Sequence, residues 1–200
     1  MNKVDLSKYD NSWRDKGASK PKRMLWFAVS SIFLNCSWNI SSGIKVRLLR
    51  LFGAKIGHHV NIKTNVIVKC PWMLEIGDYV WVGEGAWIDN NINCKIGSHV
   101  IISQGAMLLC GNHNYKKSSF DLIVGKITLE DGVWIGAKAV VCPGVTAHSH
   151  SILSVGSVVS KDMEPYGIYQ GNPAVKVKMR IINDDSKESE YRKDSFIQES

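Results

Sequence analysis

The sequence predicts an all-β fold, a parallel β-helix, because its apolar residues share a period of six. From residue 56 to residue 159 an aliphatic side chain recurs at every sixth position, with a few shifts of phase, and a small or apolar residue follows most of these positions four residues later. An α-helix needs apolar positions every three or four residues and a half-buried strand every two, so neither produces this period. A short strand and a turn, repeated around a coil, do produce it.

The residues that lead each six-residue unit are expected to stack in the interior of successive coils. They are Ile56, Ile62, Val68, Leu74, Ile76, Val82, Ile88, Ile96, Ile102, Leu108, Leu129, Ile135, Val141, Ala147, Leu153 and Val159. A single coil cannot bury its own core, so a solenoid gains stability from stacked neighbours and needs capped ends. We therefore expect residues 1–55 to form an N-terminal helical or capping segment, 56–179 the β-helix, and 180–200 a charged C-terminal tail.

Composition narrows the classes of function. The hydrophobic fraction of 44% is ordinary for a soluble globular protein. The net charge is +7, but the sequence has no arginine-rich run interleaved with aromatic residues, so we do not expect nucleic-acid binding. The five cysteines are scattered and form no CxxC pair, which argues against a disulfide framework and a zinc ribbon. The N-terminus is polar and carries acidic residues, unlike a signal peptide, so we expect a cytoplasmic location.

An apolar stretch from residue 24 to residue 40 is too short and too polar to span a bilayer, which takes about 20 predominantly apolar residues. Its aliphatic residues fall on one helical face, and two interpretations stay open. The helix packs on the end of the solenoid or on a neighbouring subunit, or residues 20–52 make peripheral contact with the inner face of the membrane. The residues that favour membrane contact are Lys20, Lys22, Arg23, Trp26 and Trp38.

The six-residue period stops between residues 109 and 128, which we expect to leave the wall of the solenoid as a protruding loop. Long loops on rigid scaffolds concentrate binding and catalytic groups. His113 lies at the root of this loop, and a neutral imidazole there can accept a proton from a hydroxyl or an amine near neutral pH. A single histidine in a loop can also be an exposed side chain with no function. The neighbouring sequence motifs distinguish the two interpretations.

The sequence around and after His113 contains an ordered set of motifs. They are Gly111-Asn-His-Asn-Tyr115, Asp131-Gly-Val-Trp-Ile-Gly136, Pro143-Gly-Val145, Val155-Gly-Ser-Val-Val-Ser-Lys-Asp162 and Gly171-Asn-Pro-Ala174. From about residue 56 to residue 179 the chain resembles the hexapeptide-repeat acyltransferases, a left-handed parallel β-helix family that includes maltose, galactoside and nodulation-type O-acetyltransferases. The likeness to the colanic-acid-biosynthesis type extends over nearly the whole chain, through residues 4–13, 49–54, 71–72, 87–90 and 102–106.

The resemblance implies an activity and a set of donor contacts. It implies acetyl transfer from acetyl-CoA to a hydroxyl of a sugar or sugar-containing precursor in surface polysaccharide biosynthesis, with His113 as general base and no metal. It also implies a homotrimer whose active sites lie between subunits. The positions that match the family's acetyl-CoA contacts are Trp134, Ala137, Val155, Ser160, Lys161 and Lys178. Val175 departs from the arginine of some relatives, which puts contacts to the 3′-phosphate in doubt.

The acceptor side is less legible from the sequence. By the same resemblance we expect Asp89, Asn90, Asn112 and Tyr115 to contact the acceptor sugar. A solvated turn at residues 89 and 90 is the competing interpretation. The sequence leaves open which sugar and which hydroxyl are modified, whether the acceptor is free, nucleotide-linked or lipid-linked, and whether the acyl group is larger than acetyl.

Two other classes of function are alternatives to this one. A γ-class carbonic anhydrase shares the repeat but binds zinc through three histidines, two of them five residues apart, and no two histidines of this chain have that spacing. A non-enzymatic binding or scaffold solenoid is the other alternative. The intact motif around His113 and the Ser160-Lys161-Asp162 element argue against it.

Overall fold

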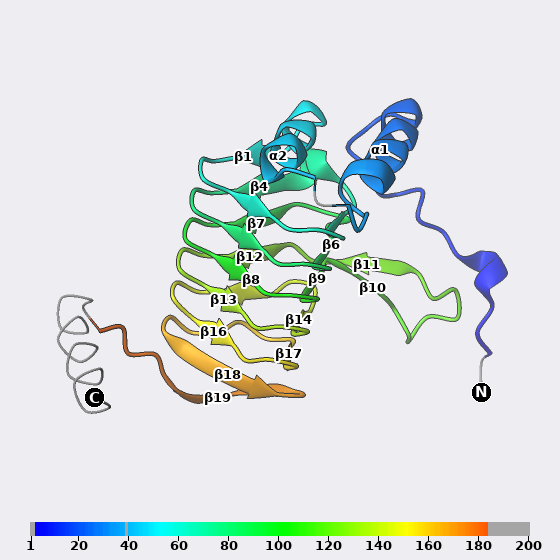
Figure 1. Ribbon diagram of the computed structural model, residues 1–200. Coiled ribbons are helices and arrows are strands. Elements are labelled where there is room, and N and C mark those ends of the chain that lie inside the picture. Colours follow the sequence, from blue (N-terminus) through cyan, green and yellow to red (C-terminus); the bar gives the residue numbers. More distant parts are fainter. Residues whose placement is uncertain (1–2, 39, 184–200) are drawn as a thin grey trace, which may run out of the picture.

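The computed structural model describes residues 3–38 and 40–183, and it confirms the predicted hexapeptide-repeat β-helix. Short strands stack into three sheets that form the walls of a solenoid and are parallel except for the closing antiparallel pair β18–β19, with helices α1 and α2 at the first coil and a hairpin projecting from one side (Figure 1). Residues 184–200 of the expected C-terminal tail lie outside the described residues. In the part of the chain that is described, no helix has the length and apolar character needed to cross a membrane.

The elements have the following bounds. Two single-turn 3-10 helices span Leu6–Lys8 and Pro71–Met73, and the α-helices are α1 (Lys20–Phe33) and α2 (Ser42–Leu51). Sheet A contains β1 (Lys55–Ile56), β4 (Leu74–Ile76), β7 (Cys94–Ile96), β12 (Ile127–Leu129) and β15 (Thr146–Ala147). Sheet B contains β2 (Asn61–Ile62), β5 (Trp81–Val82), β8 (Ile101–Ile102), β13 (Trp134–Ile135), β16 (Ile152–Leu153), β18 (Gly167–Gly171) and β19 (Ala174–Met179). Sheet C contains β3 (Ile67–Val68), β6 (Trp87–Asp89), β9 (Met107–Leu109), β14 (Val140–Val141) and β17 (Val158–Val159), and the projecting hairpin contains β10 (Gly111–His113) and β11 (Leu122–Val124).

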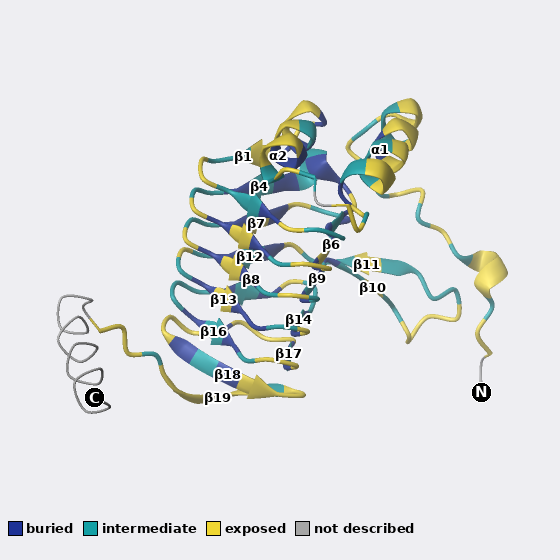
Figure 2. Ribbon diagram, viewed as in Figure 1, coloured by how far each residue is buried: buried dark blue, intermediate teal, exposed yellow. Residues whose placement is uncertain are grey.

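The core is built from the residues that lead the six-residue units. All of them are buried except Ile56, which is partly buried in the first coil. The small or apolar residues four positions later, such as Val80, Ala86 and Val100, are buried as well, apart from Val60 in the first coil, which is partly buried. Figure 2 colours these positions dark blue along the coils. Each six-residue unit therefore forms one wall and one corner of a coil, with one inward-facing side chain on the wall and one at the corner that follows.

The shifts of phase in the repeat all fall at one corner of the solenoid, where the chain passes from sheet C to sheet A. Lys55 pairs with Glu75, twenty residues on, whereas Thr128 pairs with Thr146, eighteen residues on. The additional residues lie after β3 and after β6, and after β9 the same corner expands into the hairpin β10–β11. We call this edge the C–A corner. The strand pairing resumes in register after each expansion, so the core is unchanged.

Hydrogen bonds join neighbouring coils in both directions, and Tyr79 N, for example, donates back to His58 O at 2.9 Å. In the forward direction, backbone N–H groups of one coil donate to carbonyls of the next, as Gly57 N does to Ile76 O at 2.8 Å. The first coil therefore presents carbonyl oxygens that no preceding coil can use. Buried or half-buried carbonyls without donors are costly, so this edge has to be capped by other groups.

Helix α2 supplies two of these donors. Lys45 is 1% exposed, and its ammonium group donates to the carbonyls of Ile62 at 3.3 Å and Lys63 at 2.7 Å. Arg50 donates through two nitrogens to the carbonyl of Ile56, at 3.1 and 2.8 Å. Burial lowers the pKa of the Lys45 ammonium group, because desolvation disfavours its charge. The basic residues of α2 are thus part of the cap.

Helix α1 caps the same edge from the side of sheet C. The indole of Trp26 is 3% exposed, its Nε1 donates to the carbonyl of Val68 at 2.9 Å, and its ring packs on Phe52 with centroids 5.0 Å apart. Other apolar residues of α1, including Leu25 and Phe27, stay exposed. The helix therefore packs on the solenoid through one part of its apolar surface only.

We predict that replacing Lys45 with methionine lowers the free energy of unfolding by about 1–3 kcal/mol, because two carbonyls of the first coil lose their donor. Arg47 lies on the same helix with an exposed side chain and is the matched control, for which Arg47→Met should change stability by less than about 0.5 kcal/mol. Chemical denaturation of both variants measures the difference. Equal effects at the two positions would contradict a capping role for Lys45.

Candidate active site

His113 ends β10, the first strand of the hairpin that leaves the C–A corner. Strands β10 and β11 pair antiparallel, with His113 opposite Leu122, and Asn114 N donates to Asp121 O at 2.8 Å just beyond the pair. The N-terminal segment contacts the hairpin, since Asp5 N donates to Ser118 O at 2.8 Å. The hairpin and the N-terminal segment together fix the backbone around the histidine.

The imidazole of His113 is held in one tautomer. Its Nδ1 lies 2.8 Å from the carbonyl oxygen of Phe120, and its ring stacks on the Phe120 ring with centroids 5.0 Å apart and planes 13° apart. A carbonyl oxygen can only accept a hydrogen bond, so Nδ1 must carry the proton. In the neutral ring Nε2 then has a free lone pair. The local geometry therefore prepares His113 to accept a proton through Nε2.

A cavity of about 460 Å³ surrounds this histidine. The other polar side chains that line it come from three parts of the chain and are Tyr9, Asn11, Arg14, Lys69, Asp89, Asn91 and Asn112. Strand pairing places Lys69, Asp89 and Leu109 at the same position of three successive coils, at the C–A corner. Because that corner is the expanded one, its side chains stand clear of the packed wall and can reach a ligand. We call this cavity the acceptor cavity.

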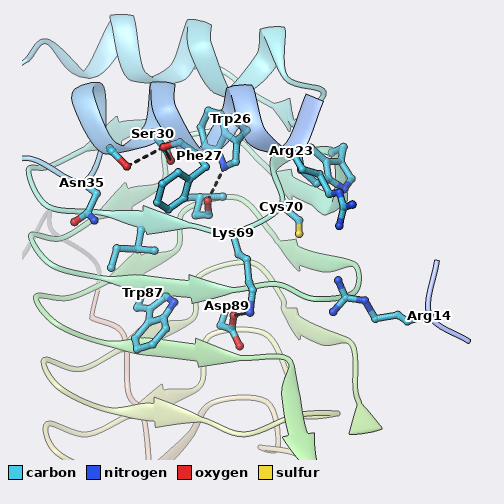
Figure 3. Close-up of a pocket in the computed structure, with 14 residues that line it drawn as sticks. Arg14, Arg23, Trp26, Phe27, Ser30, Asn35, Lys69, Cys70, Trp87 and Asp89 are labelled. Carbon is cyan, nitrogen blue, oxygen red and sulfur yellow. Dashed lines mark hydrogen bonds and ion pairs between the residues drawn. The ribbon is translucent and has the colours of Figure 1, made fainter. Parts of the chain in front are cut away.

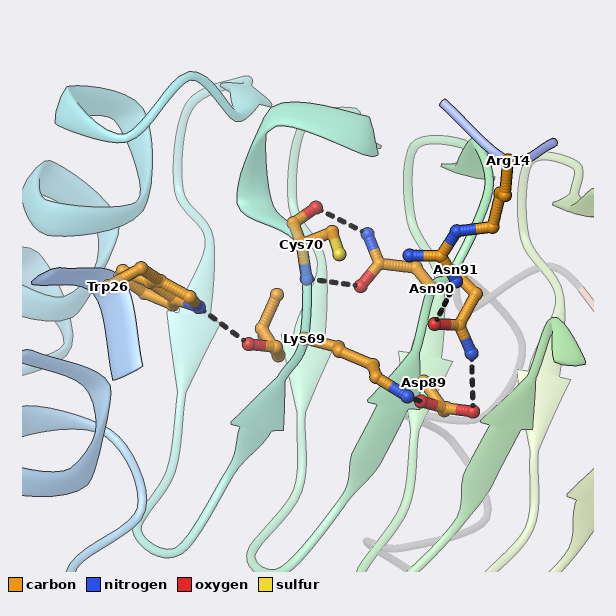
Figure 4. A network of polar contacts seen from close by, with 8 residues as sticks. Arg14, Trp26, Lys69, Cys70, Asp89, Asn90 and Asn91 are labelled. Carbon is orange, nitrogen blue, oxygen red and sulfur yellow. Dashed lines mark hydrogen bonds and ion pairs between the residues drawn. The ribbon is translucent and has the colours of Figure 1, made fainter. Parts of the chain in front are cut away.

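Charged and amide groups form a chain across the wall of the acceptor cavity (Figure 4). Lys69 Nζ lies 2.7 Å from Asp89 Oδ1, and Asn91 Nδ2 donates to Asp89 Oδ2 at 3.0 Å. Arg14 Nη1 then donates to Asn91 Oδ1 at 2.8 Å. This chain fixes the direction of each group, so the cavity offers a preorganised set of donors and acceptors.

The predicted acceptor residues divide in the structure. Asp89 and Asn112 line the acceptor cavity. Tyr115 is 76% exposed on the hairpin and is not part of the lining. Asn90 is fully buried, and its side chain accepts from Cys70 N at 3.0 Å and donates to Cys70 O at 2.6 Å, so both ends of its amide are engaged in joining two coils. The neighbouring Asn91 provides the amide that faces the cavity.

Several residues of this cavity are not marked by any motif of the sequence. Lys69 and Asp89 are twenty residues apart in successive coils, so the repeat itself could have paired them once Asp89 had been chosen. No periodic signal could have placed Tyr9, Asn11 or Arg14, because the N-terminal segment lies outside the repeat and reaches His113 through tertiary contacts. The ring centroids of Tyr9 and His113 are 5.9 Å apart.

The donor positions lie at two corners of the solenoid. Trp134, Ala137 and Val155 are at or next to the corner between sheets B and C, which we call the B–C corner. Trp134 is 43% exposed, and its Nε1 donates to Ser103 Oγ at 2.9 Å. Val155 is 71% exposed. A Cβ at Gly136 would lie 2.6 Å from Val155 N, so glycine there lets these two coils approach closely.

The remaining donor positions are cationic or polar and exposed. Ser160 and Lys161 follow β17 at the C–A corner, and Lys178 lies on β19 opposite Ile168. A single chain therefore does not gather all six donor positions at one place. Within residues 3–38 and 40–183, no three His, Cys, Asp or Glu side chains lie close enough together to hold one metal ion.

Comparison with known proteins yields relatives of one kind, although no protein-family model matches the chain. The chain is 33% identical over 177 residues to WcaF of Escherichia coli (strain K12), which is named as a colanic acid biosynthesis acetyltransferase, and the match covers 88% of this chain and 97% of that protein. It is 28% identical over 156 residues to the galactoside O-acetyltransferase of the same strain, covering 76% of this chain and 75% of the relative.

Solved structures agree in fold. The hexapeptide-repeat acetyltransferase VCA0836 of Vibrio cholerae O1 biovar eltor, solved with acetyl coenzyme A, has a TM-score of 0.74 at 24% identity, covering 83% of this chain and 92% of that one. A galactoside acetyltransferase in complex with coenzyme A has a TM-score of 0.72 at 23% identity and covers 84% of each chain. The fold and the 33% identity to WcaF over 97% of that protein lead to one conclusion: the chain belongs to the family of hexapeptide-repeat acetyltransferases.

Proposed function

We propose that the chain transfers an acetyl group from acetyl-CoA to a hydroxyl of a sugar or sugar-containing precursor in surface polysaccharide biosynthesis, with His113 as the general base. The observation that carries this proposal is the hydrogen bond from His113 Nδ1 to Phe120 O, which leaves Nε2 free to accept a proton in the acceptor cavity. WcaF and the galactoside O-acetyltransferase, named for colanic acid biosynthesis and for acetyl transfer to galactosides, support the class of acceptor.

The chemistry follows from this arrangement. A hydroxyl of the acceptor gives its proton to His113 Nε2 while its oxygen attacks the thioester carbonyl carbon. The tetrahedral intermediate collapses by breaking the carbon–sulfur bond, and the imidazolium returns the proton to the leaving thiolate. General base catalysis supplies about 10²–10⁴-fold, and holding thioester and hydroxyl together supplies a further large part of the acceleration. No acyl-enzyme intermediate is required.

The donor is assigned to a groove between neighbouring subunits, which the two sets of donor positions would border in the trimer proposed below. The solved structures that hold acetyl coenzyme A and coenzyme A support this class of ligand. The main-chain amides of Ala137 and Val155 suit the amide groups of the pantetheine arm, and Lys161 and Lys178 offer positive charge to the nucleotide phosphates. Val175 is 60% exposed on β19 and supplies no charge, so in this chain the phosphates depend on the lysines.

We propose a homotrimer in which each active site is shared by two subunits. Sheet A presents the polar residues Lys55 and Glu75 to solvent, whereas sheet B presents Trp81, Ile101 and Trp134, which are 60%, 41% and 43% exposed and stacked in register. An apolar ladder of this kind marks a contact surface. Since Ala137 and His113 are at different corners of one chain, a donor bound at the B–C corner reaches the histidine of a neighbouring copy.

Replacing His113 with alanine should lower kcat at least about 10²-fold and leave the affinity for acetyl-CoA within a few-fold, because a base acts only in the transition state. Release of free thiol from acetyl-CoA, measured with a panel of sugar acceptors, gives the rate. His58 is exposed in the first coil, far from the acceptor cavity in sequence and fold, and His58→Ala is the control that should keep full activity. Near-normal turnover of the His113 variant would remove this residue from the mechanism.

Mixed trimers test the shared site. Ala137→Arg should block the donor groove and His113→Ala should remove the base, so each variant alone is inactive. After unfolding and refolding in equal amounts, about a quarter of the interfaces should combine an intact donor corner with an intact histidine and recover activity, if the subunits assort at random. Sedimentation should report a trimer for both variants and for the mixture. An active monomer, or no recovery in mixed trimers, would contradict the shared site.

A further inference from the structure

A second cavity lies beside the acceptor cavity, between α1 and the first two strands of sheet C. It has a volume of about 360 Å³ and is lined mainly by apolar side chains, with Trp26, Phe27, Trp72 and Trp87 among them (Figure 3). Its size falls in the range of cavities that hold small molecules. We call it the α1 groove. The catalytic chemistry proposed above makes no use of it.

The α1 groove and the acceptor cavity are neighbours that share part of their walls. Arg14, Lys69 and Asp89 line both of them, so these three side chains form the neck between the two spaces. A ligand that passes the neck has one end beside His113 and the other among the tryptophans. The distribution of polarity is uneven along this path, with the base at one end, charge in the middle and apolar surface at the far end.

The neck carries an excess of positive charge. Lys69 is paired with Asp89, which leaves Arg14 and Arg23 as further cations at the inner end of the groove. The Nε atoms of both arginines are buried and have no hydrogen-bond partner among the described residues. A buried donor without an acceptor is unfavourable, so an anionic group placed at these arginines would satisfy donors that the protein leaves unused. Arginine binds phosphate oxygens through charge-assisted and often bidentate hydrogen bonds.

Four polar side chains on the walls of the α1 groove donate to backbone carbonyls. Ser30 and Ser31 donate their hydroxyls to the carbonyl of Phe27, and the indole nitrogens of Trp26 and Trp72 donate to the carbonyls of Val68 and Lys16. A nucleobase needs hydrogen-bonding partners along its edges, and Asn35 is the only amide side chain in this lining. An aliphatic chain needs no such partners and gains from the apolar area it covers.

We propose that the acceptor is a sugar joined through phosphate to a long aliphatic or isoprenoid chain, with the chain in the α1 groove, the phosphate at Arg14 and Arg23, and the sugar hydroxyl at His113. The placement of the sugar rests on the proposed function, whereas the placement of the chain and of the phosphate does not. The acceptor is thus lipid-linked, and the reaction that supplies it is the transfer of a sugar to a lipid phosphate.

Binding of farnesyl diphosphate to the full-length protein tests the proposal without acetyl-CoA. Tryptophan fluorescence is a suitable signal, because three indoles line the α1 groove. Farnesyl diphosphate should bind at least about tenfold more tightly than inorganic diphosphate, and at least about tenfold more tightly than farnesol, since chain and phosphate are recognised separately. The His113→Ala variant should bind it as well as the native chain does, so the result does not depend on whether the protein transfers acetyl groups.

Matched variants locate the two parts of the ligand. Phe27 and Leu25 are both exposed on α1, and only Phe27 lines the groove, so Phe27→Asp should weaken farnesyl diphosphate about tenfold or more and Leu25→Asp should not. Arg23→Gln should weaken farnesyl diphosphate and leave farnesol unchanged, with Arg47→Gln on α2 as the neutral control. Circular dichroism checks that each variant is folded.

Four outcomes would overturn the proposal. Farnesyl diphosphate that binds no better than inorganic diphosphate would show that the α1 groove does not hold the chain. Uridine diphosphate that competes as well as farnesyl diphosphate would make the groove a nucleotide site. Binding to anionic vesicles without binding of monomeric farnesyl diphosphate would make α1 a membrane-docking helix. A change of oligomeric state in Phe27→Asp, with no change in ligand affinity, would make the groove part of a subunit interface.

Discussion

The carbonyl edge of the first coil is the constraint on which the rest of this structure depends. Strand carbonyls of the later coils accept from N–H groups of the coil before them, as Ile76 O does from Gly57 N, and the first coil has no preceding coil to supply these donors. Trp26, Lys45 and Arg50 meet that edge with donors, which is why a segment outside the repeat is required to complete it. The same requirement brings the preceding residues alongside the C–A corner, and Arg14 reaches the acceptor cavity as a result.

The repeat allowed the fold to be predicted from the sequence, and there are physical reasons why it could not predict the whole site. Inward side chains such as Val82 and Ile102 must stack on each other, so every coil repeats the same demand, and the period, the strands and the core could all be predicted from it. Residues at the corners do not have to stack on equivalent residues of the next coil. Whether Asn90 or Asn91 faces the cavity depends on the local turn, and the pattern of apolar residues is silent on it. The contribution of Tyr9 and Arg14 arises from tertiary contacts of a segment with no period at all.

The candidate site combines three kinds of structural support. The wall of the solenoid fixes Lys69 and Asp89 through strand pairing in three successive coils. The hairpin fixes the tautomer of His113 through a carbonyl of its own second half. The N-terminal segment lies outside the repeat and supplies Arg14, whose Nε has no hydrogen-bond partner among the described residues. For the reaction proposed above, this arrangement joins a histidine fixed by the hairpin to a binding wall contributed in part by a separate segment.

At the C–A corner, the length of the chain between two strands can change without changing the packing of the core. Two residues added after β3 or β6, or a whole hairpin after β9, leave the next strand in register, because the pairing partner is set by the neighbouring coil and not by the path between strands. Insertion and deletion at this edge can therefore reshape the acceptor cavity while every buried aliphatic residue keeps its neighbours. A β-helix of this kind is free to change its substrate one corner at a time.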